Sequence, residues 1–339
     1  MILIDSVYIH NGGGKNILDN LCIKIQEFEL DNNFFFLLDY RYSPEIKLKN
    51  SKTIYPSEFN RLKFYRQNSK DFERIICLSN VPPPKKIYKP VDIYFHNDLL
   101  ISPIKNSLTL FNKLKLVLKR SYIQLINTNK YVWNVQTDLM RKKIKNEFNI
   151  SSNNINVFPI FNEYYLQTSN KKLRKNFLYV SNFSEHKNHW LLFKAFQIVS
   201  NKLNYQISLE LTLPNNVFSS SFYSKEIVNK NLKIVNHGIL NKMELSNLYS
   251  ETTFMIFPSL NESFGLPLIE AVLNDCYVIS SDRDYVYEII EPSLTFNPDS
   301  PESIASAIYE ALNSNSLKQS KLRIENKIDT FIKYILSNV

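Results

Sequence analysis

Short hydrophobic runs alternate with longer amphipathic stretches along the whole chain. The runs that predict strands are 2–9, 34–40, 74–79, 91–96, 122–127 and 155–160, then 176–181, 205–213, 232–238, 254–259, 277–281 and 294–298. The stretches that predict helices are 15–28, 131–148, 189–203, 241–251 and 301–314. Strands that alternate with helices are typical of βαβ units, which build parallel sheets. The pattern therefore predicts an α/β protein.

The pattern occurs twice, on either side of the polar stretch 162–175, which we expect to be a linker. The 339 residues also exceed the usual length of one domain. We expect two doubly wound, Rossmann-like domains facing across a cleft, over 1–165 and 170–325, and a helix over 326–339. In open parallel sheets ligands bind beyond the carboxyl ends of the strands, so the loops after the strands should carry the chemistry.

Composition narrows the class of protein. Hydrophobic residues make up 44% and charged residues 22%, which is ordinary for a globular protein, and the formal charge of +9 favours anionic partners. Cys22, Cys77 and Cys276 each lie in a hydrophobic run, which predicts buried, reduced thiols in a cytoplasmic protein. The start of the chain contains Asp5 and no basic segment, so it predicts a first strand and not a signal peptide. The most hydrophobic run, 34–38, is too short to span a bilayer, so any membrane contact should be peripheral.

Three of the five glycines, Gly12–Gly14, follow the first predicted strand and precede a helix. Glycines in such a turn let backbone N–H groups approach an anion, and the helix N-terminus adds a favourable dipole. The loop matches neither the dinucleotide fingerprint nor the phosphate loop with Lys-Ser/Thr. A ligand-binding loop and a tight turn that needs positive φ are both consistent with it.

Two other loops carry isolated candidates. His96 ends a predicted strand, where it could orient a hydroxyl or transfer a proton, although a structural histidine is an equally good interpretation. Lys187 lies near a predicted helix start, where the dipole disfavours a cation. An anion beside Lys187 would remove this conflict; the alternative is a solvated surface lysine.

The stretch FPSLNESFGLPLIEAV, 257–272, places two carboxylates around one turn. Glu262 is on the predicted loop, and Pro267 suits the first turn of the following helix. Glu270 falls one turn into that helix with its side chain directed toward the helix N-terminus, so both carboxylates can face one pocket. Carboxylates accept hydrogen bonds from sugar hydroxyls. The alternative is that Glu262 is an ordinary helix N-terminal acid and Glu270 a solvated helix residue.

This stretch resembles the most recognisable motif of the retaining glycosyltransferases of family 4, or group 1, which have the GT-B fold. The residues that match the pattern P-S-x-x-E-x-F-G-L-P-x-x-E-A are Pro258, Ser259, Glu262, Phe264, Gly265, Leu266, Pro267, Glu270 and Ala271. The resemblance implies an acceptor-binding N-terminal domain and a donor-binding C-terminal domain. It also implies transfer of a sugar from a nucleotide-sugar to a hydroxyl acceptor with retained anomeric configuration.

The resemblance further implies roles for individual residues. Lys187 would neutralise the leaving phosphate, Glu262 would contact the donor sugar, and His96 would orient the sugar or the acceptor. Glu270 would hold the ribose hydroxyls. The other residues expected to bind the donor are Asn182, Gly238, Ser263, Phe264, Gly265, Leu266, Gly13 and Gly14. Asn182 stands where the family carries a phosphate-binding arginine, which implies weaker donor binding or compensation from elsewhere.

No cofactor or metal is expected. Asp282-Arg283-Asp284 has the spacing of the Asp-x-Asp metal site of the other large glycosyltransferase fold, but its place after a late strand predicts a polar turn. The sequence contains no cluster of His and Cys ligands, and the family typically needs no metal.

The stretch 107–122 predicts a basic amphipathic helix. Leu110, Leu114, Val117 and Leu118 form one stripe, and Lys113, Lys115, Lys119 and Arg120 decorate it. Such a helix can lie on an anionic membrane, in which case the acceptor would be a glycan or lipid-linked glycan of a surface polysaccharide pathway, handled at the inner face of the membrane. The alternative is a helix packed on the core with a solvated basic face.

Other functions fit less well. The carboxylate pair could indicate a glycoside hydrolase, but the helix position of Glu270 suits nucleotide binding better. A nucleic-acid-binding protein should interleave basic residues with exposed aromatics, whereas the aromatics here lie in strand patterns. The remaining alternative is a catalytically silent GT-B protein that binds a sugar nucleotide or a partner enzyme.

Overall fold

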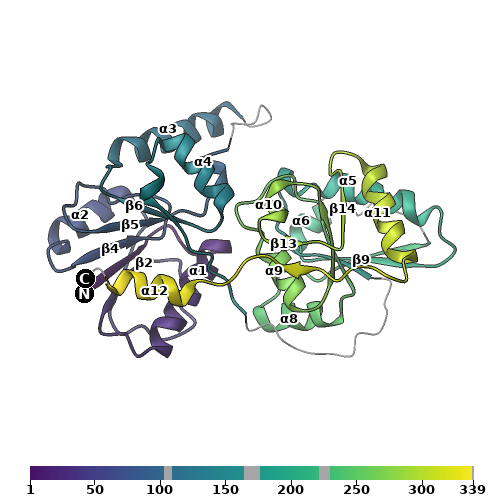
Figure 1. The fold of residues 1–339 in the computed structure, drawn as a ribbon, viewed down its shortest axis with the longest axis horizontal. Coiled ribbons are helices and arrows are strands. Elements are labelled where there is room, and N and C mark those ends of the chain that lie inside the picture. The colour runs from purple at the N-terminus through teal and green to yellow at the C-terminus, as the bar shows by residue number, and fades with distance from the viewer. Residues whose placement is uncertain (103–108, 164–175, 221–229, 338–339) are drawn as a thin grey trace. The chain divides into compact units, whose positions relative to one another are not determined.

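The computed structural model describes residues 1–102, 109–163, 176–220 and 230–337. The chain forms two compact units, one of residues 1–162 with 325–339 and one of residues 163–324 (Figure 1). Residues 164–175 of the expected linker, and residues 107 and 108 of the expected basic helix, lie outside the described residues.

The N-terminal unit contains a sheet of seven strands in the order β3-β2-β1-β4-β5-β6-β7, and every strand pair in it is parallel. The strands are β1 (Ile2–Ser6), β2 (Phe34–Asp39), β3 (Ser51–Ile54), β4 (Arg74–Cys77), β5 (Val91–Tyr94), β6 (Val132–Val135) and β7 (Ile155–Val157). The order reverses between β1 and β4, which is the topological switch point of a doubly wound fold.

Helices cover both faces of this sheet (Figure 1). They are α1 (Gly12–Glu27), α2 (Glu58–Asn68), α3 (Leu110–Ile126), α4 (Asp138–Phe148) and α12 (Ile328–Ser337), with 3-10 turns η1 (Asp98–Leu100) and η2 (Ser152–Asn154). Ile2 and Ile4 of β1 pack with α1 and α12, whereas Leu3 packs with α2 and α4. Successive strand residues point to opposite faces, so the continuous hydrophobic run of β1 is what a sheet buried on both faces requires.

Helix α12 comes from the end of the chain and completes the N-terminal unit. Its hydrophobic face, which includes Phe331 and Ile335, joins the same core as α1. The Arg74 guanidinium donates to the carbonyl oxygens of Tyr334 and Ile335, each at 3.2 Å, and pairs with Asp92 at 2.7 Å. A buried arginine thus satisfies carbonyls that the end of a helix leaves without partners.

The C-terminal unit repeats the scheme with six parallel strands in the order β10-β9-β8-β11-β12-β14. The strands are β8 (Asn176–Tyr179), β9 (Ile207–Leu211), β10 (Leu232–Asn236), β11 (Phe254–Phe257), β12 (Tyr277–Ser281) and β14 (Leu294–Phe296), with a separate antiparallel pair of β13 (Ile290–Glu291) and β15 (Lys321–Leu322). The helices are η3 (Glu185–Lys187), α5 (His189–Ser200), α6 (Asn215–Ser220), α8 (Lys242–Glu251), α9 (Leu266–Leu273), α10 (Asp284–Tyr287) and α11 (Pro301–Asn313). The predicted fold class, two doubly wound α/β units, is confirmed.

Two predicted elements were wrong. The run 122–127 belongs to helix α3, and the predicted helix 131–148 contains strand β6 before α4 begins at Asp138. A short hydrophobic run cannot be assigned to a strand or a buried helix by periodicity alone. The start of α4 did carry a local signal, because the Thr137 hydroxyl caps the helix by accepting from the Met140 N–H at 3.2 Å.

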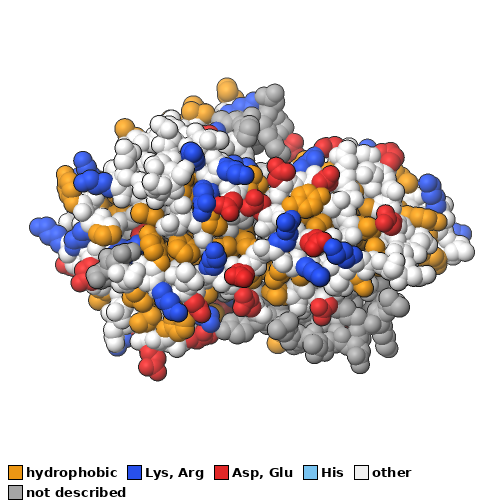
Figure 2. All heavy atoms as spheres, viewed as in Figure 1, with side chains coloured by type: hydrophobic (Ala, Val, Ile, Leu, Met, Phe, Trp, Pro, Cys, Tyr) orange, Lys and Arg blue, Asp and Glu red, His pale blue; other side chains and the backbone are white. Residues whose placement is uncertain are grey.

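The cysteines and the surface agree with the composition. Cys22, Cys77 and Cys276 are free and buried, as predicted, and burial raises the pKa of the Cys22 thiol to about 12. No helix in the described part of the chain is long and hydrophobic enough to cross a membrane. On the face shown in Figure 2, Lys and Arg side chains are interspersed with acidic and hydrophobic ones. That face therefore lacks the single-sign basic stripe typical of a nucleic-acid-binding surface.

Candidate functional site

Lys187, Glu262 and the Gly12–Gly14 loop lie where the order of the strands reverses. In the C-terminal unit, Lys187 follows β8 and Glu262 follows β11, and these two strands are neighbours. In the N-terminal unit, Gly12–Gly14 follow β1, while Asn80 follows its neighbour β4. Loops after the strands at a switch point diverge and leave room for a ligand.

Lys187 and Glu262 form the centre of the site in the C-terminal unit. The Lys187 ammonium donates to Glu262 Oε1 at 2.6 Å, and only 15% and 11% of the two side chains are exposed. The ammonium also lies 5.7 Å from the centroid of the Phe257 ring. Lys187 is therefore not the solvated surface lysine of the alternative interpretation. Nor is it inside a helix, because it ends the 3-10 turn η3 that precedes α5.

Buried polar groups hold the backbone at Lys187. The Tyr179 hydroxyl donates to the Lys187 carbonyl oxygen at 2.7 Å. Asn188 adopts a left-handed conformation with φ of 58°, and its buried side-chain amide donates to the carbonyls of Pro258 at 3.3 Å and Pro298 at 2.7 Å. These bonds join the loops after β8, β11 and β14, so the position of Lys187 is set by the sheet and not by a flexible loop.

The turn between Glu262 and α9 depends on one glycine. Gly265 precedes α9 with φ of 79°, and a Cβ added there would approach Leu268 Cδ1 to 3.2 Å. The helix that follows directs backbone N–H groups toward the loop, which favours an anion. Phe264 is 3% exposed, so only its backbone could reach a ligand, whereas Ser263 and Leu266 are half-buried.

Glu270 is not the solvated helix residue of the alternative interpretation. It is 7% exposed and accepts a hydrogen bond from the Tyr249 hydroxyl at 3.0 Å. Burial raises the pKa of Glu270 to about 7, against the opposing effect of the Tyr249 hydrogen bond. Tyr249 could not be predicted as a partner of Glu270, because it lies in α8, 21 residues earlier, and no local pattern links the two.

The other predicted donor-binding positions are less well organised. Gly238 follows β10 with φ of 73°, and a Cβ there would approach Asn215 Oδ1 to 3.2 Å. Asn182 is exposed, and no hydrogen bond to another described residue is found for it. Asp282 and Arg283 form a polar turn, with Asp282 accepting from the Tyr287 hydroxyl at 2.8 Å and Arg283 paired with Asp299. Over residues 1–102, 109–163, 176–220 and 230–337, no group of three or more His, Cys, Asp and Glu side chains is arranged to hold a metal.

In the N-terminal unit the three glycines open helix α1. Gly12 has φ of 60°, which accounts for one of them, while an added Cβ at Gly13 would meet nothing within 4 Å. Gly14 is needed for space, because a Cβ there would lie 3.0 Å from His96 Cε1. The loop is thus both a turn with positive φ and the site of a close approach to the predicted histidine.

His96 is held as a neutral imidazole. Its Nε2 lies 3.0 Å from the Leu78 carbonyl oxygen, which can only accept, and 3.3 Å from the Asn80 side-chain nitrogen, which can only donate, so each tautomer satisfies one of these two contacts. Its backbone N–H donates to Asn80 Oδ1 at 2.6 Å, and Asn80 adopts φ of 67°. Burial lowers the pKa of His96 to about 4. A neutral, oriented histidine suits hydrogen bonding to a hydroxyl better than charge stabilisation.

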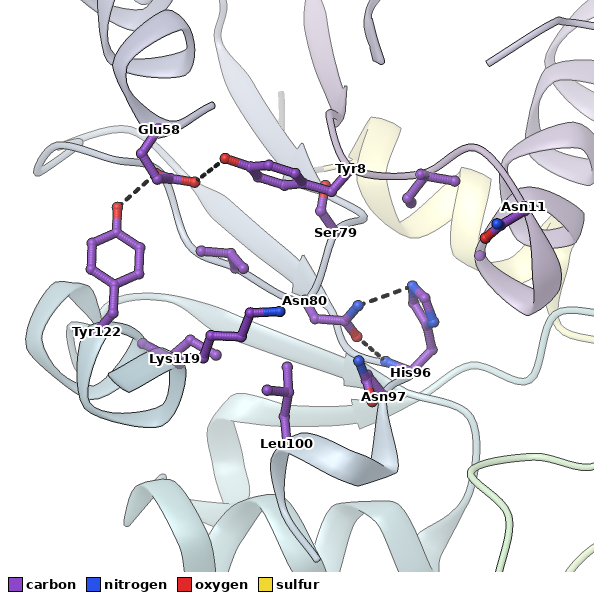
Figure 3. Close-up of a pocket in the computed structure, with 14 residues that line it drawn as sticks. Tyr8, Asn11, Glu58, Ser79, Asn80, His96, Asn97, Leu100, Lys119 and Tyr122 are labelled. Carbon is purple, nitrogen blue, oxygen red and sulfur yellow. Dashed lines mark hydrogen bonds between the residues drawn. The ribbon is translucent and has the colours of Figure 1, made fainter. Parts of the chain in front are cut away.

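A pocket of about 460 Å³ opens beside His96 (Figure 3). The polar side chains that line it include Tyr8, Asn11, Asn80, His96, Lys119 and Tyr122, which come from the loops after β1, β4 and β5 and from α3. His96 was predicted as a site residue from the sequence, and Lys119 only as part of a basic helix. The other four carried no recognisable motif, because tertiary packing alone brings them together.

We predict opposite effects for alanine at two adjacent glycines. Gly14→Ala should lower stability by ~1–3 kcal/mol, because the new methyl group overpacks against the His96 ring. Gly13→Ala should be neutral or stabilising by up to ~1 kcal/mol, since it has open space and removes glycine from a helix. Thermal unfolding and the NMR shift of the His96 Hε1 proton measure both. Equal stability of the two variants would contradict the contact.

The prediction that Lys187, Glu262 and Glu270 meet the Gly12–Gly14 loop in one cleft stays a prediction.

Each of the two units is a doubly wound α/β sheet with polar residues in the loops after its strands. Residues 165–329 match the family model of the glycosyl transferases group 1. The structure resembles a crystal structure of HepE from Anabaena in complex with UDP and glucose, with a TM-score of 0.68 and 13% identity over 100% of this chain and 99% of that one. The predicted GT-B fold is thereby confirmed, and the C-terminal half of the chain is similar to the glycosyl transferases group 1 over residues 165–329.

Two curated proteins are similar over parts of the chain. The O-antigen chain mannosyltransferase RfbU of Salmonella typhimurium is 41% identical over 66 residues, 19% of each protein. The capsular polysaccharide biosynthesis glycosyltransferase CapH of Staphylococcus aureus is 27% identical over 197 residues, 53% of each protein. The similarity thus spans about half or less of the length of these relatives.

Proposed function

We propose that this protein is a retaining, metal-independent glycosyltransferase that moves a sugar from a nucleotide-sugar to a hydroxyl acceptor. The observation that carries the proposal is the Lys187–Glu262 ion pair, fixed at a strand-end switch point within the part of the chain that matches the family. A cation held there by the sheet is preorganised for a leaving diphosphate. The relative HepE has been crystallised with UDP and with UDP-glucose, so a UDP-sugar is the first donor to test.

The chemistry needs charge stabilisation more than proton transfer. As the bond from the anomeric carbon to the diphosphate breaks and the bond to the acceptor oxygen forms, negative charge develops on the diphosphate. The Lys187 ammonium and the backbone amides at the start of α9 would stabilise that charge, and Glu262, released from its ion pair, would accept hydrogen bonds from the donor sugar. Glu270 would accept from the ribose hydroxyls.

A second candidate is a catalytically silent protein that only binds a sugar nucleotide or a partner enzyme. The observation that favours it is Asn182, which stands where the family has an arginine and is exposed. Donor binding without hydrolysis or transfer in the wild-type protein would support this alternative.

For the acceptor, we propose a glycan or lipid-linked glycan of a surface polysaccharide, and peripheral contact of the protein with the cytoplasmic face of the membrane. The similarity to RfbU, an O-antigen chain mannosyltransferase, and to CapH, a capsular polysaccharide biosynthesis glycosyltransferase, supports this substrate class. Helix α3 supports the membrane contact, because Leu110, Phe111 and Leu118 are exposed at 83%, 75% and 60% on a helix that also carries lysines.

The proposed donor site is tested by thermal shift against UDP-, GDP-, ADP- and CMP-sugars. One donor class should stabilise the protein by a few degrees, because a ligand that binds the folded state adds RT ln(1 + [L]/Kd) to its stability. If the ionised Glu270 binds ribose, donor affinity should rise about tenfold between pH 6 and pH 8, as this carboxyl ionises.

The matched control is Glu270→Gln, which should bind the donor more weakly and without this pH dependence. The melting temperature without donor must also be measured at each pH, because the stability of the free protein changes with pH. A pKa raised from 4.5 to about 7 means that the folded state holds this proton more tightly than the unfolded state does. The free protein therefore loses stability as the pH rises from about 4.5 to about 7. If none of the four nucleotide classes shifts the melting temperature, the proposed function is wrong.

A further inference from the structure

Helix α3 packs on the N-terminal unit by an unusually small part of its surface. Ile123 is its only buried residue among those described. Its outer side carries a groove of about 400 Å³, lined by Phe111, Leu114 and Leu118 together with Lys115, Lys119 and Tyr122. Three large hydrophobic side chains, 75%, 56% and 60% exposed, thus flank one groove next to ammonium groups. Hydrophobic side chains gathered on an exposed surface are typical of a binding site.

The groove on α3 and the pocket beside His96 share two residues. Lys119 and Tyr122 line both, so the hydrophobic groove adjoins the polar pocket. Figure 3 shows the Lys119 side chain extending into the pocket toward Asn80. A single ligand could therefore occupy both, with a hydrophobic part along α3 and a polar part between Asn80 and His96.

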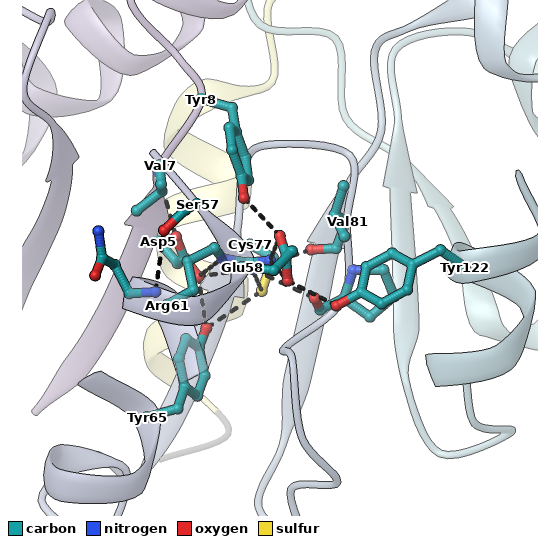
Figure 4. A network of polar contacts seen from close by, with 12 residues as sticks. Asp5, Val7, Tyr8, Ser57, Glu58, Arg61, Tyr65, Cys77, Val81 and Tyr122 are labelled. Atoms are coloured by element: carbon teal, nitrogen blue, oxygen red, sulfur yellow. Dashed lines mark hydrogen bonds and ion pairs between the residues drawn. The ribbon is translucent and has the colours of Figure 1, made fainter. Parts of the chain in front are cut away.

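The charged groups at the boundary between groove and pocket are arranged so that Lys119 can bind an anion. Glu58, the carboxylate that lines the pocket, already accepts from the hydroxyls of Tyr8 at 2.7 Å and Tyr122 at 2.6 Å and pairs with Arg61 at 3.0 Å (Figure 4). Lys119 forms no ion pair with a carboxylate of the described residues. Partial burial and the neighbouring Lys115 lower the pKa of Lys119, and an anion bound there would oppose both effects.

We propose that the acceptor is an anionic amphiphile, a lipid phosphate-linked saccharide, bound across this boundary. Its lipid chain lies along Phe111, Leu114 and Leu118, its phosphate lies at Lys119, and its saccharide enters the pocket beside His96. Phe111 and Lys119 are eight positions apart on the helix and so ~12 Å apart along its axis, which is enough for part of a lipid chain and more than a free sugar phosphate needs. This inference rests on the proposed transfer to a hydroxyl acceptor and names the class of that acceptor.

The test compares three probes with the full chain by isothermal titration, all below their critical micelle concentrations. Decyl phosphate carries the anion and the chain, decyl maltoside carries the chain without charge, and inorganic phosphate carries the charge alone. Decyl phosphate should bind at least tenfold more tightly than either of the others. Equal binding of decyl phosphate and inorganic phosphate, or of decyl phosphate and decyl maltoside, would overturn the proposal.

Substitutions on α3 distinguish specific binding at this site from non-specific adsorption of an amphiphile to the protein. Lys119→Met should weaken decyl phosphate at least tenfold, whereas Lys113→Met, on the same helix but lining neither cavity, should not. Leu118→Gln should weaken both amphiphiles, whereas Leu125→Gln, at an 82% exposed leucine outside the groove, should weaken neither. All four replace partly or fully exposed side chains, so the variants should fold. Equal losses in each matched pair would indicate non-specific adsorption and overturn the site.

The donor panel distinguishes the two possible failures. If a nucleotide-sugar stabilises the wild-type protein but decyl phosphate shows no preference, the proposed function stands and the acceptor class is wrong. If decyl phosphate binds as expected but no nucleotide-sugar binds, the cavity is a lipid-phosphate site and its assignment as an acceptor site is wrong.

Discussion

Replacing Lys187 by methionine should lower sugar transfer, or donor hydrolysis, by about 10²–10³-fold, as is typical when one preorganised group that stabilises transition-state charge is removed. The Lys187 side chain is 15% exposed, and its backbone is held by the hydrogen bond that the Tyr179 hydroxyl donates to the Lys187 carbonyl oxygen, so the ammonium has a fixed position. Methionine retains most of the hydrophobic stem that packs near Phe257. The measurement is kcat for release of the free nucleotide from the donor found in the panel.

A suitable control for Lys187→Met is Lys194→Met. Lys194 lies on α5 in the same unit, with its ammonium 4.8 Å from the centroid of the Trp190 ring, and carries no role in the proposed site. Its replacement should leave kcat within a factor of two or so, since surface substitutions usually act weakly. Lys187→Met with unchanged kcat and unchanged donor affinity would exclude Lys187 from the chemistry.

Replacing Arg61 by methionine should destabilise the N-terminal unit by ~3–5 kcal/mol, because it leaves Asp5 as an uncompensated buried charge. Both side chains are fully buried, and the Arg61 guanidinium donates to Asp5 Oδ2 at 2.8 and 3.0 Å (Figure 4). The Tyr65 hydroxyl donates to the same oxygen at 2.8 Å and cannot supply the missing charge. Chemical denaturation followed by circular dichroism measures the loss.

Two further variants serve as controls for the loss of stability in Arg61→Met. Arg141→Met removes a surface pair with Asp138, in which 41% and 58% of the side chains are exposed, and should cost at most ~1 kcal/mol. The double variant Asp5→Asn/Arg61→Met removes the charge as well as its partner and should be less destabilised than the sum of the two single variants. Additive losses would mean that the pair is not coupled, contrary to the geometry.

The sequence predicted what depends on local pattern. Alternating strands and helices identified the α/β class because a strand buried on both faces leaves a continuous hydrophobic run, as in β1 and β11. The run of residues around Gly265 identified the half that matches the glycosyl transferases group 1, because several matching residues lie within one loop and helix. Where a hydrophobic run was short and without a cap, as in 122–127, the pattern could not separate helix from strand.

Which side chains contact one another at the candidate sites was determined by the tertiary structure alone. Lys187 and Glu262 are 75 residues apart, Glu58 and Tyr122 are 64 apart, and the contact of Gly14 with His96 joins two different strand ends. The sequence by itself therefore determined the fold class and the chemical types at the site, since both follow from short-range spacing. The pairing of Lys187 with Glu262, the raised pKa of Glu270 and the pocket beside His96 exist only because parallel strands bring distant loops to one edge of each sheet and exclude water from them.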